Sequence, residues 1–297
     1  MAEAISQPAV STGPARSAAY EVVIDQSKGR LGVAIREAIA ARELLILMTL
    51  RDVSTRYRQA ALGVAWALLI PLLRLAVFGV FFGVVGRFGP DGMPYVVFLF
   101  AGMVIWDYFS GAMGRAANSL EASQGLLAKV YFPRLLLPVS GVLSSVVEFG
   151  FTLVVLVLLM AWHHDKVSPD WQAMAWLPAY FVLTMGAAAG MGLWLAGFNA
   201  HYRDVRQGLP VVIQMGFFST PVLYPIELVR ERLPEWAVVL YELNPMTTAV
   251  LGFRAGLLGT DGPHGWAIAA AVGIVALLLV TGLVVFNRLE KTIADVL

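Results

Sequence analysis

The sequence has no cysteine and few charged residues. Without cysteine, the chain cannot form disulfides, thiolate metal sites or a cysteine nucleophile. Charged residues make up 14% of the 297 residues, whereas soluble domains carry about 25%. Hydrophobic residues account for 59%, and the formal net charge is only +1. Lipid replaces water around an apolar excess of this size, so the composition indicates an integral membrane protein.

The common catalytic motifs are also missing. A P-loop needs glycine directly before lysine and then serine or threonine, but Lys28, Lys129, Lys166 and Lys291 follow Ser, Ala, Asp and Glu. The chain therefore cannot hydrolyse ATP by that route, and a pump that contains it must take its energy from a partner. No nucleophile elbow and no His-Glu-x-x-His motif occurs.

Histidines cluster at His163-His164-Asp165. Adjacent residues of a helix point to different faces, so these side chains fit an exposed loop better than a set of metal ligands. We therefore expect no catalytic residue, no metal site, no cofactor bound by this chain and no nucleic-acid partner.

Six stretches are candidates for transmembrane helices, which need about 20 mainly apolar residues. The fifth is short, and Pro210, Pro221 and Pro225 make its ends uncertain, because proline removes a helical hydrogen bond. We expect an all-α membrane protein in which residues 1–30 form a disordered cytoplasmic tail and residues 31–297 form one transmembrane domain. The expected spans are Ala61–Val85, Tyr95–Met113, Leu135–Trp162, Met174–Phe198, Leu209–Tyr224 and Trp266–Phe286.

Basic residues gather on one side of these spans, which sets the orientation, because cytoplasmic loops carry an excess of lysine and arginine. We therefore expect both termini in the cytoplasm of a multi-pass protein. The inner segments hold Arg16, Lys28, Arg30, Arg36, Arg42, Arg51, Arg56, Arg58, Arg115, Lys129, Arg134, Arg203, Arg206, Arg288 and Lys291, and the outer segments hold Arg87, Lys166, Arg230, Arg232 and Arg254.

A further helix is expected before the first span, at Leu44–Gln59. At 100° per residue, one stripe of this helix is apolar and the opposite side is polar. We favour an amphipathic helix at the cytoplasmic membrane surface, and a cytosolic helix packed on protein is the alternative. The apolar stripe consists of Ile46, Leu50, Val53 and Tyr57, and the polar side of Arg51, Thr55 and Arg58.

The outer segment Ile226–Gly265 is apolar but is interrupted by Pro234 and Asn244-Pro245. Neither piece is long enough to span, so we expect two short amphipathic helices that dip into the outer leaflet. Such pieces must be helical and packed on protein, because unpaired backbone is excluded from lipid. One extra span is the alternative, but it would place the C-terminus outside.

Ionisable residues inside the spans are Arg74, Asp107 and Glu148. Charges at this depth are costly and often functional. We favour an internal ion pair of Arg74 with Glu148 or Asp107 over a role in binding substrate. The glycine pairs Gly79-x-x-x-Gly83 and Gly186-x-x-x-Gly190 indicate close helix packing.

Aromatic residues are frequent in and around the spans, where many serve as interfacial anchors or core. Aromatic rings can also bind the C–H faces of a sugar polymer without gripping one hydroxyl. As candidates to line a channel we take Tyr108, Glu148, Phe217, Phe218 and Tyr224.

Several local patterns, in order along the chain, carry a resemblance to a known family. From about Leu44 to its end, the chain resembles the ABC-2 type permeases that export polysaccharides, which are the membrane subunits of O-antigen, capsule and teichoic-acid transporters. The patterns are Leu50-Arg51-Asp52 with Arg56-Tyr57, Leu62-Gly63-Val64-Ala65-Trp66, Gly102 with Trp106-Asp107-Tyr108-Phe109, Lys129-Val130-Tyr131-Phe132-Pro133-Arg134, Asn199 with Tyr202-Arg203-Asp204, Ser219–Pro225 and Asn244-Pro245.

The resemblance implies a non-catalytic permease in the bacterial inner membrane. It implies a homodimer that works with two copies of an ABC ATPase, which would hold ATP and magnesium, and a lipid-linked polysaccharide, foremost O-antigen, as substrate. The outer short helices resemble periplasmic gate helices. The loop after the second span resembles the helix that couples to the ATPase, which implies a coupling role for Glu121, Gln124, Lys129, Tyr131, Phe132, Pro133 and Arg134.

The anionic head of such a substrate needs cations at the cytoplasmic entrance. Arg51, Arg56 and Arg58 lie at that depth, and guanidinium groups suit phosphate. An equally good alternative is that these arginines bind lipid headgroups or acidic residues of the ATPase. Arg74 is a departure from the family pattern.

The sequence is also compatible with other functions. They are an ABC-2 exporter of teichoic acid, capsule, or a small lipid or drug, a membrane-embedded enzyme acting on lipid-linked sugars, and a channel or scaffold without ATP. The enzyme fits poorly, because Asp107 and Glu148 stand in different spans rather than as a pair near one membrane face.

Overall fold

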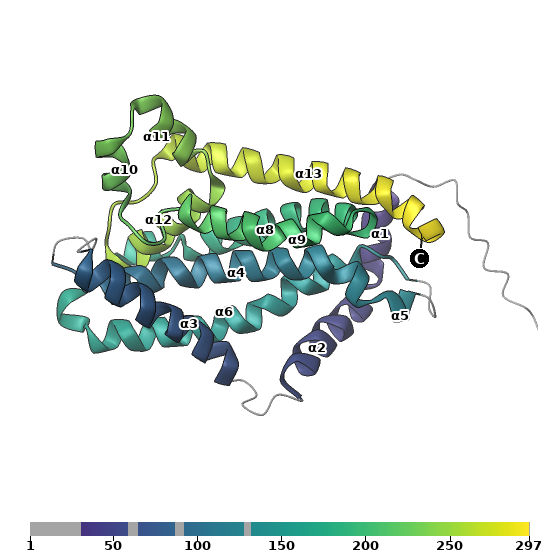
Figure 1. Ribbon diagram of the computed structural model, residues 1–297, viewed down its shortest axis with the longest axis horizontal. Helices are drawn as coiled ribbons and strands as arrows, with labels where there is room; N and C mark the ends of the chain where they lie inside the picture. Colours follow the sequence, from purple (N-terminus) through teal and green to yellow (C-terminus); the bar gives the residue numbers. More distant parts are fainter. Residues whose placement is uncertain (1–30, 59–64, 87–91, 128–131, 297) are drawn as a thin grey trace, which may run out of the picture.

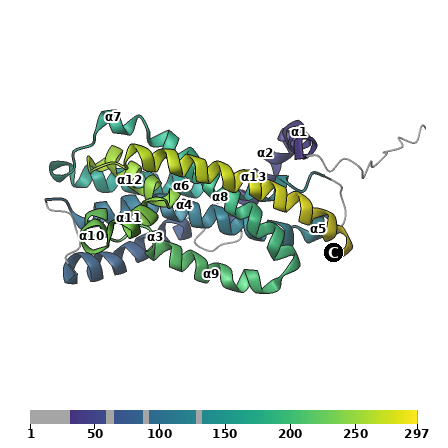
Figure 2. The ribbon, with the colours of Figure 1, turned by 90° about the horizontal axis from the view of Figure 1, so that it is seen from above.

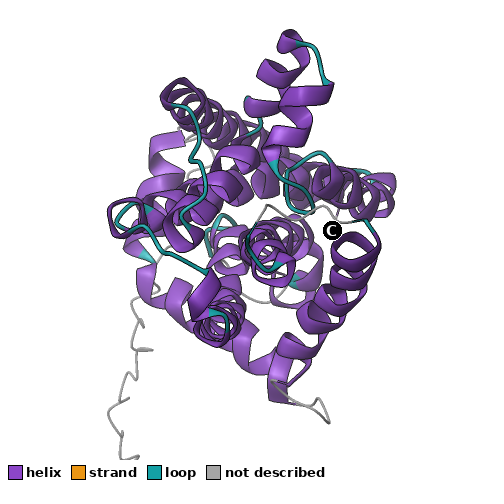
Figure 3. Cartoon of the chain, turned by 90° about the vertical axis from the view of Figure 1, so that its left-hand side faces the viewer, coloured by secondary structure: helices purple, strands orange, loops and turns teal. Residues whose placement is uncertain are grey.

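The computed structural model describes residues 31–58, 65–86, 92–127 and 132–296. Every regular element in these residues is a helix (Figure 1, Figure 3). The expected tail, the start of the first expected span, Lys129 and Tyr131 lie outside the described residues. The helices are α1 (Leu31–Ala40), α2 (Arg42–Arg58), α3 (Ala65–Phe78), η1 (Gly79–Val85), α4 (Tyr95–Ala122), α5 (Gln124–Leu127), α6 (Leu136–Trp162), η2 (His164–Lys166), α7 (Trp171–Met174), α8 (Leu177–His201), α9 (Arg203–Phe218), α10 (Ile226–Arg232), α11 (Glu235–Glu242), α12 (Pro245–Leu258) and α13 (Gly265–Val296).

Four of these helices are long and apolar enough to cross a membrane: α4, α6, α8 and residues Gly265–Leu289 of α13. The apolar stretch of α4 is 78% buried, whereas that of α13 is 17% buried. α4 packs against α6, α8 and α12 and forms the centre of the bundle. A helix that is apolar all round suits this central place, and the exposed apolar faces of α6 and α13 suit lipid.

The bounds of several expected spans differ from those of the helices. α4 continues beyond Met113 to Ala122, because no residue interrupts its hydrogen bonds before Ser123. α13 likewise continues beyond Phe286. In the region of the fifth expected span, α9 begins at Arg203, keeps Pro210 inside it and ends at Phe218, before the turn that contains Pro221 and Pro225. Apolarity does not predict these helix ends, because helices extend into polar sequence.

Small residues allow the closest helix contacts. A Cβ atom at Gly190 of α8 would lie 2.9 Å from the backbone of Leu278, and one at Gly282 of α13 would lie 2.6 Å from the carbonyl oxygen of Gly190. A Cβ at Gly83 would lie 2.6 Å from the ring of Tyr95. The expected role of these glycine pairs in packing is therefore confirmed for Gly190 and Gly83.

α3 and α9 lie along the edges of the bundle (Figures 1 and 2). α3 continues directly into the π-helix η1, and together they contain the shorter apolar helix Leu68–Val84. Large apolar side chains of α3 and η1 are exposed, among them Leu73, Val77 and Phe81. α9 likewise exposes Val211 and Met215.

The helix expected before the first span is α2, and it packs against α6. Its stripe of apolar residues is divided: Ile46 and Leu50 are exposed, whereas Val53 and Tyr57 are half-buried. Met48 is buried, and it joins Leu120 and Phe132 in one apolar cluster. α2 thus presents an apolar surface outward while its other side contacts protein.

The outer segment differs from the expected pair of amphipathic helices. It forms three helices, α10, α11 and α12, and α12 is buried on all sides from Met246 to Leu258. Small residues permit this, since a Cβ at Gly252 would lie 2.2 Å from the ring of Tyr180. Asn244 caps α12 by accepting a 3.0 Å hydrogen bond from Met246 N, and Gly259, with φ of +67°, ends it.

The two ends of the bundle hold different elements. α1, α5 and the C-terminus lie at one end, and α10 and α11 lie at the opposite end (Figure 1). α11 exposes Trp236 and Leu240 at its end of the bundle. Because α1 and the C-terminus share one end, the chain crosses the length of the bundle an even number of times.

Candidate functional site

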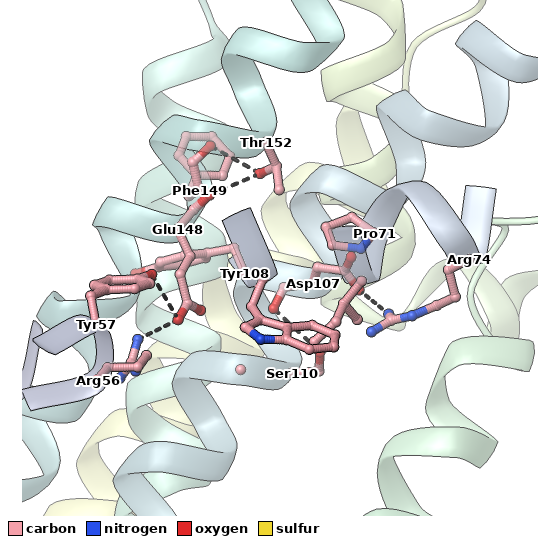
Figure 4. A pocket seen from close by; sticks show the side chains of 13 residues that line it. Arg56, Tyr57, Pro71, Arg74, Asp107, Tyr108, Ser110, Glu148, Phe149 and Thr152 are labelled. Carbon is pink, nitrogen blue, oxygen red and sulfur yellow. Dashed lines mark hydrogen bonds and ion pairs between the residues drawn. The ribbon is translucent and has the colours of Figure 1, made fainter. Parts of the chain in front are cut away.

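Two cavities lie beside α2, where it packs against α6. The smaller cavity, about 410 Å³, is lined by α2, α3, α4 and α6 (Figure 4). The larger cavity, about 650 Å³, is lined by α2, α4, α5 and α6. Arg56 lines both cavities, so they meet at its side chain.

A triad of Arg56, Glu148 and Arg115 stands where the cavities meet. Arg56 Nη1 donates to Glu148 Oε1, and Arg115 Nη1 lies 3.0 Å from Glu148 Oε2. Arg115 Nε also donates to Ser145 Oγ at 2.7 Å. Figure 4 shows Arg56 reaching Glu148 from α2. Two guanidinium groups thus share one carboxylate, and the triad has a net charge of +1.

Local sequence explains how the triad is assembled. Arg56 follows Met48 and Asp52 at helical spacing, on the side of α2 that faces α6. A Cβ atom at Gly111, one turn before Arg115, would lie 3.0 Å from Arg115 Nη2, so this glycine leaves room for the guanidinium. Burial and then the Glu148 carboxylate raise the pKa of Tyr57, so this phenol stays protonated beside the triad.

A second ion pair joins Arg74 of α3 to Asp107 of α4 in the smaller cavity (Figure 4). The expectation that Arg74 forms an internal ion pair is confirmed, with Asp107 as its partner. Glu148, the other expected partner, belongs to the triad instead.

The larger cavity has more positive than negative side chains in its wall. Arg51, Arg56 and Arg115 line it together with the single carboxylate of Asp52. Asp52 is itself bonded, at 2.9 Å to Arg51 Nη2 and at 3.1 Å to Ser140 Oγ. Because Arg56 and Arg115 share Glu148 and Arg51 pairs with Asp52, these groups carry an excess of one positive charge, which favours binding of an anion such as phosphate.

Two of the three arginines expected at an entrance therefore meet in one cavity. Arg51 and Arg56 line the larger cavity, whereas Arg58 is exposed and lines neither cavity. Sequence reasoning did not identify Arg115, which it assigned to a cytoplasmic loop because the expected span ended at Met113. The uninterrupted helical sequence up to Ser123 is the signal that would have placed it inside α4.

The expected channel-lining residues are only partly brought together. Tyr108 and Glu148 line the smaller cavity, and Tyr108 Oη is buried without a hydrogen-bond partner among the described residues. Phe217 is buried and stacks on Phe78, with ring centroids 5.6 Å apart. Phe218 is exposed on α9, and Tyr224 Oη donates to its carbonyl oxygen at 2.6 Å.

The expected coupling residues lie at the end of the bundle that holds α5. Glu121 pairs with Arg206, which connects the end of α4 to the start of α9. Gln124 is exposed on α5, and Phe132 is buried in the apolar cluster that also contains Met48. Pro133 and Arg134 are half-buried, and Lys129 and Tyr131 lie outside the described residues.

Arg254 is a buried arginine that sequence reasoning assigned to an outer loop. Its side chain is 1% exposed and lies 3.6 Å from the centroid of the Phe98 ring. It donates to three backbone carbonyls, those of Phe98 (3.1 Å), Pro221 (2.5 Å) and Val222 (2.6 Å). Arg254 thereby ties α12 to α4 and to the turn after α9.

Gly102 of α4 makes this arrangement possible, because a Cβ there would lie 2.5 Å from Arg254 Nη2. At the same end of the bundle, Arg230 donates to Glu242 at 2.7 and 3.0 Å and lies 3.0 Å from His264 Nε2. In the described part of the chain, no three His, Asp or Glu side chains gather as metal ligands.

Comparison with known proteins gives one consistent result. The model of the ABC-2 type transporter family matches residues 43–258. The O-antigen export system permease protein RfbA of Myxococcus xanthus is 28% identical over 88% of this chain and 98% of its own length. RfbA of Klebsiella pneumoniae is 27% identical over 86% of this chain and 95% of its own length. The polysialic acid transport protein KpsM of Escherichia coli is 22% identical over 82% and 92%. The chain therefore belongs to the ABC-2 type transporter family, whose members form the membrane-embedded part of a transporter.

Proposed function

We propose that this chain is the membrane subunit of an ATP-driven exporter that moves a lipid-linked polysaccharide, foremost O-antigen, across the bacterial inner membrane. One observation carries the proposal: the similarity to O-antigen export permeases extends over nearly the full length of both chains. A capsule polysaccharide is the second candidate, because the similarity to KpsM covers almost as much of the chain.

The proposed topology has six spans. The four long helices supply four, α3 with η1 supplies one, and α9 with the turn after it supplies one. An even number agrees with α1 and the C-terminus at one end of the bundle, and the positive-inside rule assigns this end to the cytoplasm. α10 and α11, at the opposite end, would then be the periplasmic gate helices.

The proposed complex contains two copies of this chain and two copies of an ABC ATPase, which holds ATP and magnesium. The ATPase would dock at the end that holds α5, near Glu121, Gln124, Phe132 and Arg134, and near Lys129 and Tyr131. The pair between Glu121 and Arg206 would carry movement from there to α9. The exposed apolar faces of α3 and α9 provide surface for lipid or for the second copy.

The export experiment deletes the gene for this chain in its host and restores it from a plasmid. We expect deletion to remove the polysaccharide from the cell surface while lipid-linked polymer accumulates inside, and the plasmid to restore display. An affinity-tagged copy should retain an ABC ATPase after detergent purification. Unchanged display in the deletion strain would contradict the function, and purification without any ATPase would contradict the proposed complex.

A further inference from the structure

The wall of the larger cavity has the charge needed to bind an anion. Of its titratable side chains, three are guanidinium groups and one is the Asp52 carboxylate. Both oxygens of Asp52 already accept hydrogen bonds, from Arg51 and Ser140. Arg56 and Arg115 therefore have Glu148 as their carboxylate partner among the described residues. A charge excess at this depth is costly unless an anion balances it at some stage.

Glu148 holds the position that such an anion would take. It lies between the two guanidinium groups, one on each of its oxygens, which is also how two arginines bind a phosphate group. Glu148 lines the smaller cavity, Arg115 lines the larger, and Arg56 lines both. The triad therefore lies at the border of the two cavities.

We propose that the triad is an anion-exchange site: a phosphate group that enters the larger cavity displaces Glu148 from between Arg56 and Arg115. The exchange needs no covalent step, because one anion replaces another on the same two cations. Once Arg56 no longer bonds Glu148, the ion pair between α2 and α6 at the border of the two cavities is broken. The proposal rests on the proposed function for the source of the phosphate, which would be a lipid-borne diphosphate.

Phosphate fits this site better than a carboxylate does. It brings a higher charge and more acceptor oxygens, so it can engage both guanidinium groups and still accept from neighbouring hydroxyls. Ser119 and Ser144 line the larger cavity, and the hydroxyl of each now donates to a backbone carbonyl of its own helix. Rotation of these hydroxyls would supply further donors to a phosphate oxygen.

The test measures binding of farnesyl diphosphate and of inorganic pyrophosphate to the purified full-length chain in phosphatidylcholine nanodiscs, by isothermal titration. Glu148→Gln removes the competing charge but keeps the side-chain shape, so we expect both probes to bind about tenfold more tightly. Arg115→Gln removes one of the two cations, so we expect binding to weaken about tenfold. Farnesol, which has no phosphate, should not bind.

Arg230→Gln is the matched control, because it removes an arginine that also pairs with a carboxylate, at the opposite end of the bundle. A misfolded variant cannot gain affinity, so the tighter binding of Glu148→Gln is the decisive result. An equal response to both probes assigns the site to phosphate itself, and a response to farnesyl diphosphate alone assigns it to a lipid-borne phosphate. Unchanged or weaker binding in Glu148→Gln, or an equal change in Arg230→Gln, would overturn the exchange site.

The outcome can be separated from that of the proposed function. If Glu148→Gln does not bind the probes more tightly while the unmodified chain restores polysaccharide display, the exchange site is wrong and the export function stands. If the affinities shift as expected while the chain does not support display, the site stands and the substrate class is wrong.

Discussion

Arginines with several partners occur in two regions of this bundle, one buried and one half-buried, and their surroundings differ. Arg254 is enclosed completely and donates to three backbone carbonyls, which hold their positions as parts of α4 and of the turn after α9. Arg56 and Arg115 share a side-chain carboxylate and border cavities. Backbone carbonyls cannot leave their guanidinium without moving a helix, whereas a carboxylate on a side chain can rotate away. We therefore interpret Arg254 as part of the scaffold and the triad as a part that can rearrange.

The largest loss of stability is expected for Arg254→Met, which tests whether Arg254 belongs to the scaffold. It leaves the carbonyls of Pro221 and Val222 without their donor in a buried place, so we expect a loss of at least about 3 kcal/mol of stability. The thermal midpoint of the detergent-purified chain, followed by tryptophan fluorescence, measures the effect. Arg232→Met, at an exposed arginine of α10, should lower the midpoint much less. Equal midpoints for the two variants would refute the scaffold role of Arg254.

The next effect concerns the room that Arg254 needs. Gly102→Ala places a methyl group 2.5 Å from Arg254 Nη2 and 3.3 Å from the carbonyl oxygen of Val222, so we expect destabilisation of about 1–3 kcal/mol. Gly114→Ala on the same helix is the control, because a Cβ there meets nothing within 4 Å. That variant should be neutral or gain up to about 1 kcal/mol. A stable Gly102→Ala variant would show that the guanidinium is not confined.

The triad should lose less stability than the Arg254 region when charges are removed, provided that Arg115 and Glu148 are replaced together. Arg115→Gln alone leaves Glu148 with Arg56, and Glu148→Gln alone leaves two guanidinium groups close together. We expect the double variant to be more stable than the sum of the single effects predicts, by about 1 kcal/mol, because close ionic partners couple. A double-mutant cycle of thermal midpoints tests this. Strict additivity would mean that the 3.0 Å contact between Arg115 and Glu148 carries no coupling.

The smallest effect on stability is expected at the end that holds α5. Gln124→Ala and Glu121→Ala should leave the thermal midpoint nearly unchanged, because both side chains are exposed and substitutions at the surface usually shift stability by less than about 0.5 kcal/mol. If this end docks the ATPase, both variants should nevertheless reduce polysaccharide display and ATPase retention. Normal display with normal retention in both variants would refute the coupling role.

The membrane class, the helical architecture and the family patterns could be read from the sequence, because long apolar stretches and ordered motifs are local signals. The pair of Arg74 and the packing of Gly190 followed from the same reasoning, since a charge or a glycine in an apolar helix needs a neighbour. Hydropathy assigned Arg115 to a loop because it follows the expected end of a span, and it assigned Arg254 to a loop because it lies between two expected spans. Their partners, Glu148 and the carbonyls after α9, are distant in sequence.

The burial of α12 also could not be predicted from the sequence. Its 14 residues are too few for a span and interrupted at Asn244-Pro245, so apolarity suggested a surface helix. Only the tertiary contacts with α4, α7, α8 and α13 show that it fills the interior. Glycines at Gly252 and Gly256 were visible in the sequence, but their spacing alone did not identify the helices they approach.

The position of α3 at the edge of the bundle has a mechanical consequence. This helix forms one wall of the smaller cavity, yet most of its large apolar side chains are exposed, and the pair of Arg74 with Asp107 links it to α4. A segment with few buried contacts can swing out at small energetic cost, while the core around α4 stays intact. We therefore expect the smaller cavity to be adjustable, because a bulky ligand could widen it by displacing α3 alone.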